Sequence, residues 1–323
     1  MVSTAIQSAE TILVTGGCGF IGANLVPMLE EAGYSVRVLD NLAKGDSSLL
    51  AGCRAEIVVG DIRDCAAVAQ ALEGVDAVIH LAAFGSVVES VAAPAENFDV
   101  NARGTFVVLD ECRKRGIARF VFASTGGALI GNADPPVNED SRPRPISPYG
   151  SSKLCGEAYC SSFAHSYNMH VTALRFANVV GPCSWHKKGA VTAFAKAIMS
   201  QDPLRIFGDG SATRDFLYVE DLCKGIGLAL RAALPGFNPL HLASGREVSI
   251  GELARLMARI AGDDNYPIEY APKRAGEVDR NFARFDRASA LLGFEPQYSL
   301  EEGLTRTWEW FELERSKRGS AGV

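Results

Sequence analysis

Short apolar runs rich in β-branched residues alternate, through the first half of the chain, with longer segments whose apolar positions recur at helical spacing. This alternation predicts βαβ units, and therefore a parallel sheet with helices on both faces. The predicted strands are TILVT at 11–15, VRVLD at 36–40, AEIVVGD at 55–61, AVIHLAA at 77–83, FVFAST at 120–125 and VTALRFANV at 171–179. The predicted helices span 21–32, 66–72, 95–115 and 149–167.

The pattern loosens after residue 181. A helical segment at 191–200 and an extended segment at 203–210 predict a second, smaller module laid over the sheet. Segment 213–233 and the strand-like LHLAS at 240–244 return to the main sheet, before a helical segment at 250–262 and a tail around Trp308. We therefore expect a main domain of residues 1–176 and 214–245, and a smaller domain of 177–213 and 246–323.

Composition and charge narrow the class of protein. The chain has 323 residues, 47% of them hydrophobic, which is enough for a large core. Its net charge of −6 is spread without a basic run, which argues against nucleic-acid binding. No apolar stretch reaches the roughly 18 residues that span a bilayer, and no signal peptide is evident, so we expect a cytoplasmic protein without membrane contact. The eight cysteines contain no CxxC pair and the five histidines have no ligand spacing, which predicts reduced thiols and no metal site.

The first predicted strand runs into the segment GGCGFIG and then into a helix, which places Gly16, Gly19 and Gly22 in a GxxGxxG arrangement. The first glycine permits a tight turn, the second lets the backbone approach a pyrophosphate, and the third allows close helix packing. A glycine-rich turn without a ligand is the alternative for this segment alone. Asp40 ends the second strand 18 residues after Gly22, where a carboxylate accepts both ribose hydroxyls and repels a 2′-phosphate. Together they predict a dinucleotide site that favours NAD over NADP.

Asp61 ends the third predicted strand. It suits two roles equally, as an acceptor for the adenine amino group or as the cap of a helix from Ile62 onward.

Tyr149 and Lys153 lie four residues apart at the start of a predicted helix, so both side chains share one face. An ammonium beside a phenol lowers the pKa of the phenol, and we therefore expect Tyr149 to act as a base near neutral pH. Such a pair also arises by chance. Its place after FVFAST, at the carboxyl edge of the sheet where ligands bind, favours the catalytic interpretation.

Taken together, these segments resemble the extended short-chain dehydrogenase/reductases, and within them the NAD-dependent epimerase/dehydratase family, over essentially the whole chain. The resemblance rests on ten stretches in order: VTGGCGFIG, VLDNL, GDIRD, VIHLAA, VNARGT, FASTGG, YGSSK, LRFANVVGP, IFGDGSATRDFLYVEDL and KRAGEV. It implies an α/β, Rossmann-type doubly wound sheet that binds NAD and a smaller domain that binds a nucleotide sugar.

The resemblance to the UDP-sugar 4-epimerases of this family implies a catalytic set of Thr125, Tyr149 and Lys153, with Ser124 as a structural neighbour. Tyr149 takes the proton of the sugar 4-hydroxyl while hydride passes from C4 to the nicotinamide. The 4-keto sugar then rotates and receives the hydride on its other face. Thr125 hydrogen-bonds O4, and Lys153 holds the nicotinamide ribose, so NAD stays bound and is not consumed.

Further residues follow from the same resemblance. The implied cofactor-binding residues are Gly16, Gly19, Phe20, Ile21, Gly22, Asp40, Asn41, Asp61, Ile62, Leu81, Ala82, Ala83, Asn101, Tyr149, Lys153 and Phe176. The implied substrate-binding residues are Ser86, Thr125, Gly126, Tyr149, Asn178, Gly189, Ala190, Val191, Arg205, Phe207, Arg214 and Arg274. Arg214 and Arg274 suit a diphosphate because a guanidinium donates two parallel hydrogen bonds, and Phe207 suits the uracil. For any single arginine, a surface ion pair is the alternative.

Three departures from the family pattern leave the identity of the substrate sugar undetermined. Leu129-Ile130-Gly131 replaces the frequent VYG, Gly85 replaces a lysine, and Asn281 replaces a bulky tyrosine, which leaves more room. Dehydratases of the family carry an Asp-Glu pair where this chain has Gly126 and Gly127, whose open backbone amides suit a hydroxyl or a uronate carboxylate. UDP-glucose, UDP-glucuronate and UDP-N-acetylglucosamine all stay candidates.

Two other classes of function are alternatives for this sequence. A non-catalytic dinucleotide-binding regulator is expected to lose Tyr149 or Lys153, and both are present. A net oxidoreductase would need added NAD and would change its absorbance with turnover. The resemblance also implies a homodimer that pairs through the helices at 95–115 and 149–167.

Overall fold

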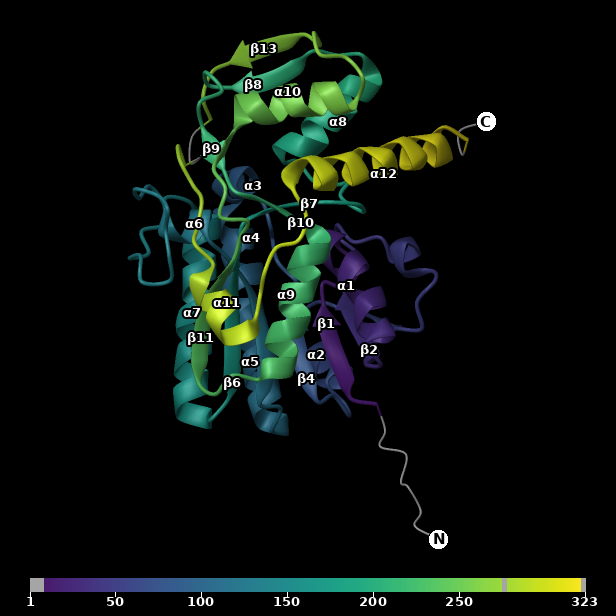
Figure 1. Cartoon of the computed structure of the whole chain (residues 1–323). Helices are drawn as coiled ribbons and strands as arrows, with labels where there is room; N and C mark the ends of the chain where they lie inside the picture. Colours follow the sequence, from purple (N-terminus) through teal and green to yellow (C-terminus); the bar gives the residue numbers. More distant parts are fainter. Residues whose placement is uncertain (1–8, 275–277, 321–323) are drawn as a thin grey trace.

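The computed structural model describes residues 9–274 and 278–320 (Figure 1). Residues 275–277 of the KRAGEV stretch and the first eight residues lie outside this description. The centre is a seven-stranded sheet in the order β11-β6-β5-β4-β1-β2-β3, and every neighbouring pair is parallel. The strands are β1 (Thr11–Thr15), β2 (Ser35–Asp40), β3 (Glu56–Val59), β4 (Ala77–His80), β5 (Arg119–Thr125), β6 (His170–Phe176) and β11 (Phe237–Leu242). The predicted Rossmann-type fold is confirmed.

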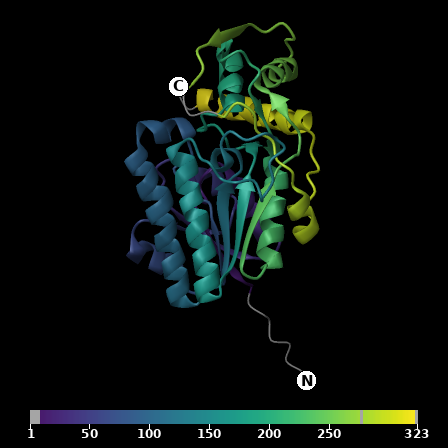
Figure 2. The ribbon, with the colours of Figure 1, turned by 90° about the vertical axis from the view of Figure 1, so that its left-hand side faces the viewer.

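Helices cover both faces of the sheet because each strand buries alternate side chains on opposite sides. Ile12 and Val14 belong to one apolar core, whereas Leu13 between them belongs to the other. On the first face lie α1 (Phe20–Glu31) and α9 (Val219–Ala232). On the second lie α2 (Cys65–Ala71), α5 (Thr105–Arg115) and α7 (Pro148–Tyr167), of which α5 and α7 run side by side (Figure 2).

Two predicted elements are interrupted. The helix predicted at 95–115 is formed by α4 (Pro94–Phe98), the π-helical turn η2 (Asp99–Gly104) and α5. The strand predicted at 171–179 divides into β6 and β7 (Asn178–Val180), because the backbone N–H of Asn178 donates to Asp215 instead of continuing the main sheet. β7 pairs with β10 (Phe216–Tyr218).

A second layer lies beyond the carboxyl ends of the main strands, at the top of Figure 1. It contains α8 (Ala190–Ser200), β8 (Leu204–Phe207), α10 (Ile250–Ile260), β13 (Ile268–Ala271) and α12 (Leu300–Ser320). β13 pairs with β8, and β9 (Thr213–Arg214) pairs with β12 (Val248–Ser249). In contrast, α11 (Asp286–Leu292) packs back against β11 and α9. The division of the chain into two domains with separate ligands stays a proposal.

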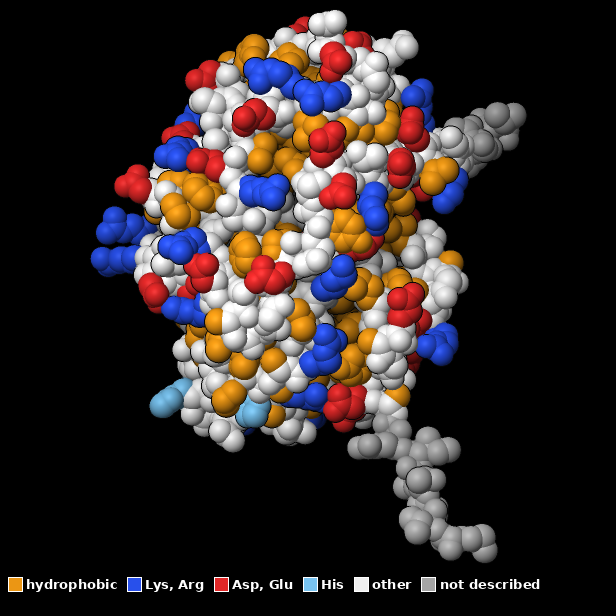
Figure 3. Space-filling model, in the orientation of Figure 1, with side chains coloured by type: hydrophobic (Ala, Val, Ile, Leu, Met, Phe, Trp, Pro, Cys, Tyr) orange, Lys and Arg blue, Asp and Glu red, His pale blue; other side chains and the backbone are white. Residues whose placement is uncertain are grey.

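The remaining short elements surround the carboxyl edge of the sheet. They are η1 (Ser47–Leu50), α3 (Val87–Ala92) and α6 (Gly127–Ile130). Within residues 9–274 and 278–320, no helix is long and apolar enough to cross a membrane. On the face shown in Figure 3, Lys and Arg side chains are interspersed with Asp and Glu.

Candidate active site

The three glycines after β1 meet different surroundings. Gly16 has a φ of +71°, and a methyl group there would lie 2.7 Å from the backbone of Ala82. A methyl group on Gly22 would lie 2.4 Å from the backbone of Gly17, so Gly22 permits the close contact between helix and loop. At Gly19, the N-cap of α1, the one atom of the described residues that a methyl group would meet within 4 Å is the carbonyl oxygen of Gly16, at 3.2 Å. Packing therefore explains Gly16 and Gly22, while Gly19 keeps the approach to α1 open, which fits a pyrophosphate.

Asp40 lies at the end of β2, beside this loop. Its carboxylate accepts hydrogen bonds from the backbone N–H groups of Cys18, at 3.0 Å, and Leu42, at 2.8 Å. The side chain is buried, and each oxygen retains further acceptor capacity. The carboxylate is thereby fixed next to the glycine loop, where a ribose would lie. These residues fit NAD.

Asp61 is held by neighbouring side chains and does not cap the helix that follows it. It accepts hydrogen bonds from Arg63 and, at 2.9 Å, from Asn41, and these contacts lower its pKa. The helix that follows is α2, and its N-cap is Asp64, whose carboxylate accepts from Ala66. The alternative in which Asp61 caps this helix is therefore wrong.

Thr125, Tyr149 and Lys153 meet where β5 ends and α7 begins. The Tyr149 side chain is hydrogen-bonded to the Thr125 side chain. The ammonium of Lys153 donates to the carbonyl oxygen of Ala123, at 2.8 Å, and lies 5.0 Å from the ring centre of Phe122. α7 begins here because Ser147 caps it, with its side chain accepting from Gly150, and Pro148 occupies the first turn. The three predicted catalytic residues are thus brought together.

The electrostatics of this group differ from the sequence expectation for Tyr149. Burial raises the pKa of Tyr149 to about 12, and the hydrogen bond to Thr125 offsets only part of that effect. Burial lowers the pKa of Lys153 to about 8. The ammonium is directed at the Ala123 carbonyl, so the protein alone keeps Tyr149 a neutral phenol.

Asn101 links the predicted cofactor site to α7. Its carboxamide oxygen accepts from the backbone of Phe84, at 2.7 Å, and its nitrogen donates to Ser152, at 3.0 Å. Asn101 lies in η2, and π-helical turns are frequent at functional sites. Ser86 caps α3, and Ser90 of that helix accepts from the backbone N–H of Tyr149, at 3.1 Å. Ser90 is not predictable from the sequence, since no local pattern marks it.

The other predicted cofactor residues line the same edge of the sheet. Leu81, Ala82 and Ala83 follow β4 directly, and Phe176 ends β6 opposite Thr125. Phe20 and Ile21 open α1, while Ile62 is buried beneath η2 against Gly104.

The predicted substrate residues come from the second layer and its connections. Asn178 opens β7, and Gly189 caps α8, whose first turn contains Ala190 and Val191. Arg205 and Phe207 lie on β8, and Arg214 lies on β9 and donates to the carbonyl of Thr213. The guanidinium of Arg274 lies 3.5 Å from the ring centre of Phe207, so this predicted pair is in direct contact.

The glycine pair after Thr125 is less open than expected. The amide of Gly126 donates to the carbonyl of Phe176, at 3.0 Å, so the expectation of an open amide is wrong for Gly126. A methyl group on Gly127 would lie 2.2 Å from the carboxamide nitrogen of Asn281. Asn281 is buried and occupies the space beside Gly127.

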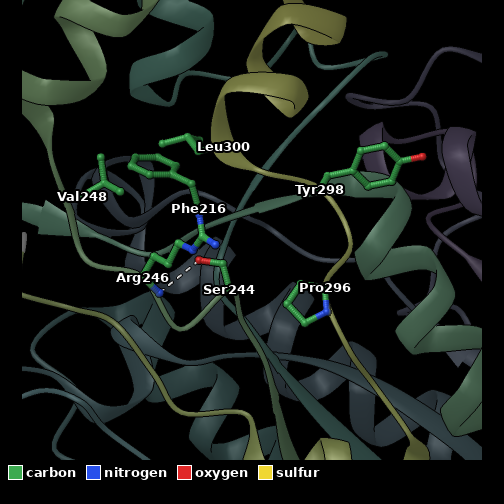
Figure 4. A pocket seen from close by; sticks show the side chains of 7 residues that line it. All are labelled: Phe216, Ser244, Arg246, Val248, Pro296, Tyr298 and Leu300. Carbon is green, nitrogen blue, oxygen red and sulfur yellow. Dashed lines mark hydrogen bonds between the residues drawn. The ribbon is translucent and has the colours of Figure 1, made fainter.

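A small cavity of about 50 Å³ lies away from these residues (Figure 4). It lies between β10, β12 and the start of α12, and none of the predicted site residues lines it. Its lining residues are Phe216, Ser244, Arg246, Val248, Pro296, Tyr298 and Leu300. This cavity is too small for a sugar nucleotide.

Comparisons with known proteins agree with this arrangement. The model of the NAD dependent epimerase/dehydratase family matches residues 12–243. A UDP-glucose 4-epimerase of Mycolicibacterium smegmatis is 35% identical over 309 residues, covering 93% of this chain and 97% of that protein. A UDP-glucuronate 4-epimerase of Thermodesulfobacterium geofontis is 31% identical over 311 residues, with coverages of 92% and 95%. The crystal structure of a UDP-glucose 4-epimerase from Thermotoga maritima with UDP-glucose has a TM-score of 0.89 at 36% identity, with coverages of 95% and 100%.

Proposed function

Because the chain belongs to the NAD-dependent epimerase/dehydratase family, we propose that it interconverts the C4 epimers of a UDP-sugar. The observation that carries the proposal is the contact between Thr125 and Tyr149 at the carboxyl end of β5, beside the glycine loop. The next two residues are Gly126 and Gly127, which supply no acid or base for the loss of water. The arrangement favours epimerisation over dehydration.

The site residues have separate roles in the proposed reaction. Thr125 hydrogen-bonds the 4-oxygen of the sugar, and Tyr149 takes its proton and later returns it. Lys153 holds the nicotinamide ribose, while Arg214 and Arg274 bind the diphosphate. NAD held by the glycine loop and Asp40 would supply a reversible acceptor for the C4 hydride, and its positive charge would lower the pKa of Tyr149. NAD is therefore a resident cofactor rather than a consumed substrate.

Incubation of the purified protein with UDP-glucose, UDP-glucuronate and UDP-N-acetylglucosamine tests this function. We expect the C4 epimer of one of them to form without added NAD and with no net change in absorbance at 340 nm. The two sugars named in the related proteins, glucose and glucuronate, are the first candidates. A 4-keto, 6-deoxy product would contradict the proposal and indicate dehydration, whereas stoichiometric reduction of NAD would indicate a net oxidoreductase.

We also propose that the chain forms a homodimer through α5 and α7. Phe106 on α5 and Tyr159 and Tyr167 on α7 are exposed, and the rings of Phe106 and Tyr159 lie 5.3 Å apart. Exposed aromatic side chains on two adjacent helices are typical of a protein interface.

Light scattering after gel filtration tests the dimer. The double substitution Phe106→Glu with Tyr159→Glu is expected to give a monomer, because it buries two carboxylates in the interface. Leu313→Glu is the matched control, since Leu313 is also an exposed apolar residue, more exposed than Phe106 or Tyr159, but lies on α12. A dimer that survives the double substitution would place the interface elsewhere. The cytoplasmic location stays a prediction from the sequence.

A further inference from the structure

A row of buried polar side chains crosses the sheet directly behind the catalytic group. Ser124 on β5 lies opposite Arg175 on β6, and Arg175 lies opposite His241 on β11. Residues in register on neighbouring parallel strands point to the same face of the sheet. All three are buried, and the row lies one residue before Thr125 along the strand. Polar groups at such depth are costly unless they are paired.

Glu157 on α7 is the partner of this row. Its carboxylate accepts the hydroxyl of Ser124, at 2.6 Å, and two N–H groups of Arg175, at 3.0 and 2.8 Å. The side chains of Glu157 and Arg175 are each only 5% exposed. Removing one partner of a buried ion pair leaves an uncompensated charge, so each of these two side chains requires the other.

The pair fixes the strand that carries Thr125 to the helix that carries Tyr149. Lys153 donates to the carbonyl of Ala123, and one helical turn later Glu157 accepts from Ser124. Two successive residues of β5 are thus bonded to two successive turns of α7. The residue that follows them on β5 is Thr125.

Glu157 also acts on the charge of Lys153. The groups that act on Lys153 are Cys160 and Glu157 on its own helix, and Lys153 in turn acts on His80 from β4. Burial raises the pKa of Cys160 well above its usual value and lowers that of His80 to about 3, so both are neutral near pH 7. Among the described residues, Glu157 is the charged group that opposes the burial effect on Lys153 and favours its ammonium form.

We propose that Glu157 is a positioning residue for the reaction, which holds Thr125 against Tyr149 and keeps Lys153 protonated, with Arg175 as its buried counter-charge. The inference rests on the proposed function for its kinetic consequence. Its electrostatic consequence is independent of the substrate, since it concerns two side chains of the same helix.

The substitution Glu157→Gln tests the proposal. We expect the alkaline limb of the pH profile of kcat to move down by about one unit, because an opposite charge near Lys153 is lost. KM for the UDP-sugar is expected to stay within about twofold, since Glu157 is buried and its hydrogen-bond partners, Ser124 and Arg175, are not among the predicted substrate residues. In the same holoprotein, ¹³Cε-lysine NMR should show the Lys153 resonance, identified by its loss in Lys153→Met, titrating at lower pH.

Glu157→Gln removes the counter-charge of the buried Arg175, which lowers stability. A second variant therefore tests the same proposal without an uncompensated charge. The double substitution Glu157→Leu with Arg175→Leu removes both charges and is expected to fold. The double variant should still lower the pKa of Lys153, because Arg175 is not among the groups that act on that ammonium. Asp221→Asn is the matched control, since it removes another deeply buried carboxylate, on α9, and should leave the pH profile in place.

The outcomes separate this inference from the proposed function. A downward shift in both Glu157 variants, and none in Asp221→Asn, supports the positioning role. Reduced activity with an unchanged alkaline limb and an unchanged Lys153 titration would reduce Glu157 to a structural residue and overturn the proposal. If the wild-type protein forms no C4 epimer, the proposed function fails, while the Lys153 titration still decides whether Glu157 controls its charge.

Discussion

Tyr149→Phe is expected to reduce kcat by about 10² to 10⁴-fold, the usual contribution of a positioned acid–base group. The ring of phenylalanine retains the packing at the start of α7, and only the hydroxyl that contacts Thr125 is lost. KM and bound NAD should therefore change little. Turnover of the UDP-sugar by the purified variant, with the NAD content measured after denaturation, checks both expectations.

Tyr159→Phe is the matched control for this experiment. Tyr159 lies on the same helix but is exposed, and its hydroxyl has no role in the proposed reaction. The control is expected to retain wild-type kcat. Near wild-type turnover in Tyr149→Phe would contradict the assignment of Tyr149 as the proton acceptor.

Lys153→Met is expected to abolish most activity and yet to increase stability. Burial lowers the pKa of Lys153 from 10.5 to about 8, so the protonated side chain costs the folded state about 3 kcal/mol at neutral pH. Loss of the hydrogen bond to Ala123 offsets part of the gain, and a net increase of about 1 to 2 kcal/mol in the free energy of unfolding follows. A catalytic residue that destabilises the fold is a known trade-off between stability and activity.

The contribution of Lys153 to the free energy of unfolding changes with pH, and the direction of this change can be measured. Between pH 8 and 10.5 the unfolded chain binds more protons at Lys153 than the folded protein does. Stability conferred through this residue therefore rises with pH across that window. The difference in the free energy of unfolding between Lys153→Met and the wild type, measured in urea at pH 7.5 and 10, should therefore become smaller at the higher pH. Buried cysteine thiols with raised pKa values act on both proteins alike and cancel in this difference.

Lys317→Met is the control for a lysine that is not buried. Lys317 lies on α12 and is exposed, so its removal should change neither stability nor its pH dependence appreciably. A Lys153→Met variant that is less stable than wild type at pH 7.5 would show that the contact with Ala123 outweighs the cost of burying the charge.

The sequence by itself determined the α/β order, the parallel sheet and the glycine loop, because these depend on local periodicity and on backbone conformation at single positions. The spacing of Tyr149 and Lys153 likewise placed both on one face of α7, as the structure has them. Asp40 was placed beside the glycine loop because β1 and β2 are neighbours in the βαβ unit that the sequence predicts.

Only the tertiary structure decided the surroundings of those residues. Ser124 meets Glu157 across 33 positions of the chain, and Asn281 fills the space beside Gly127, which no local pattern reveals. The prediction that the pKa of Tyr149 is lowered was wrong for the same reason. Desolvation depends on every atom packed around a group, whereas the sequence shows only the four-residue spacing to a lysine.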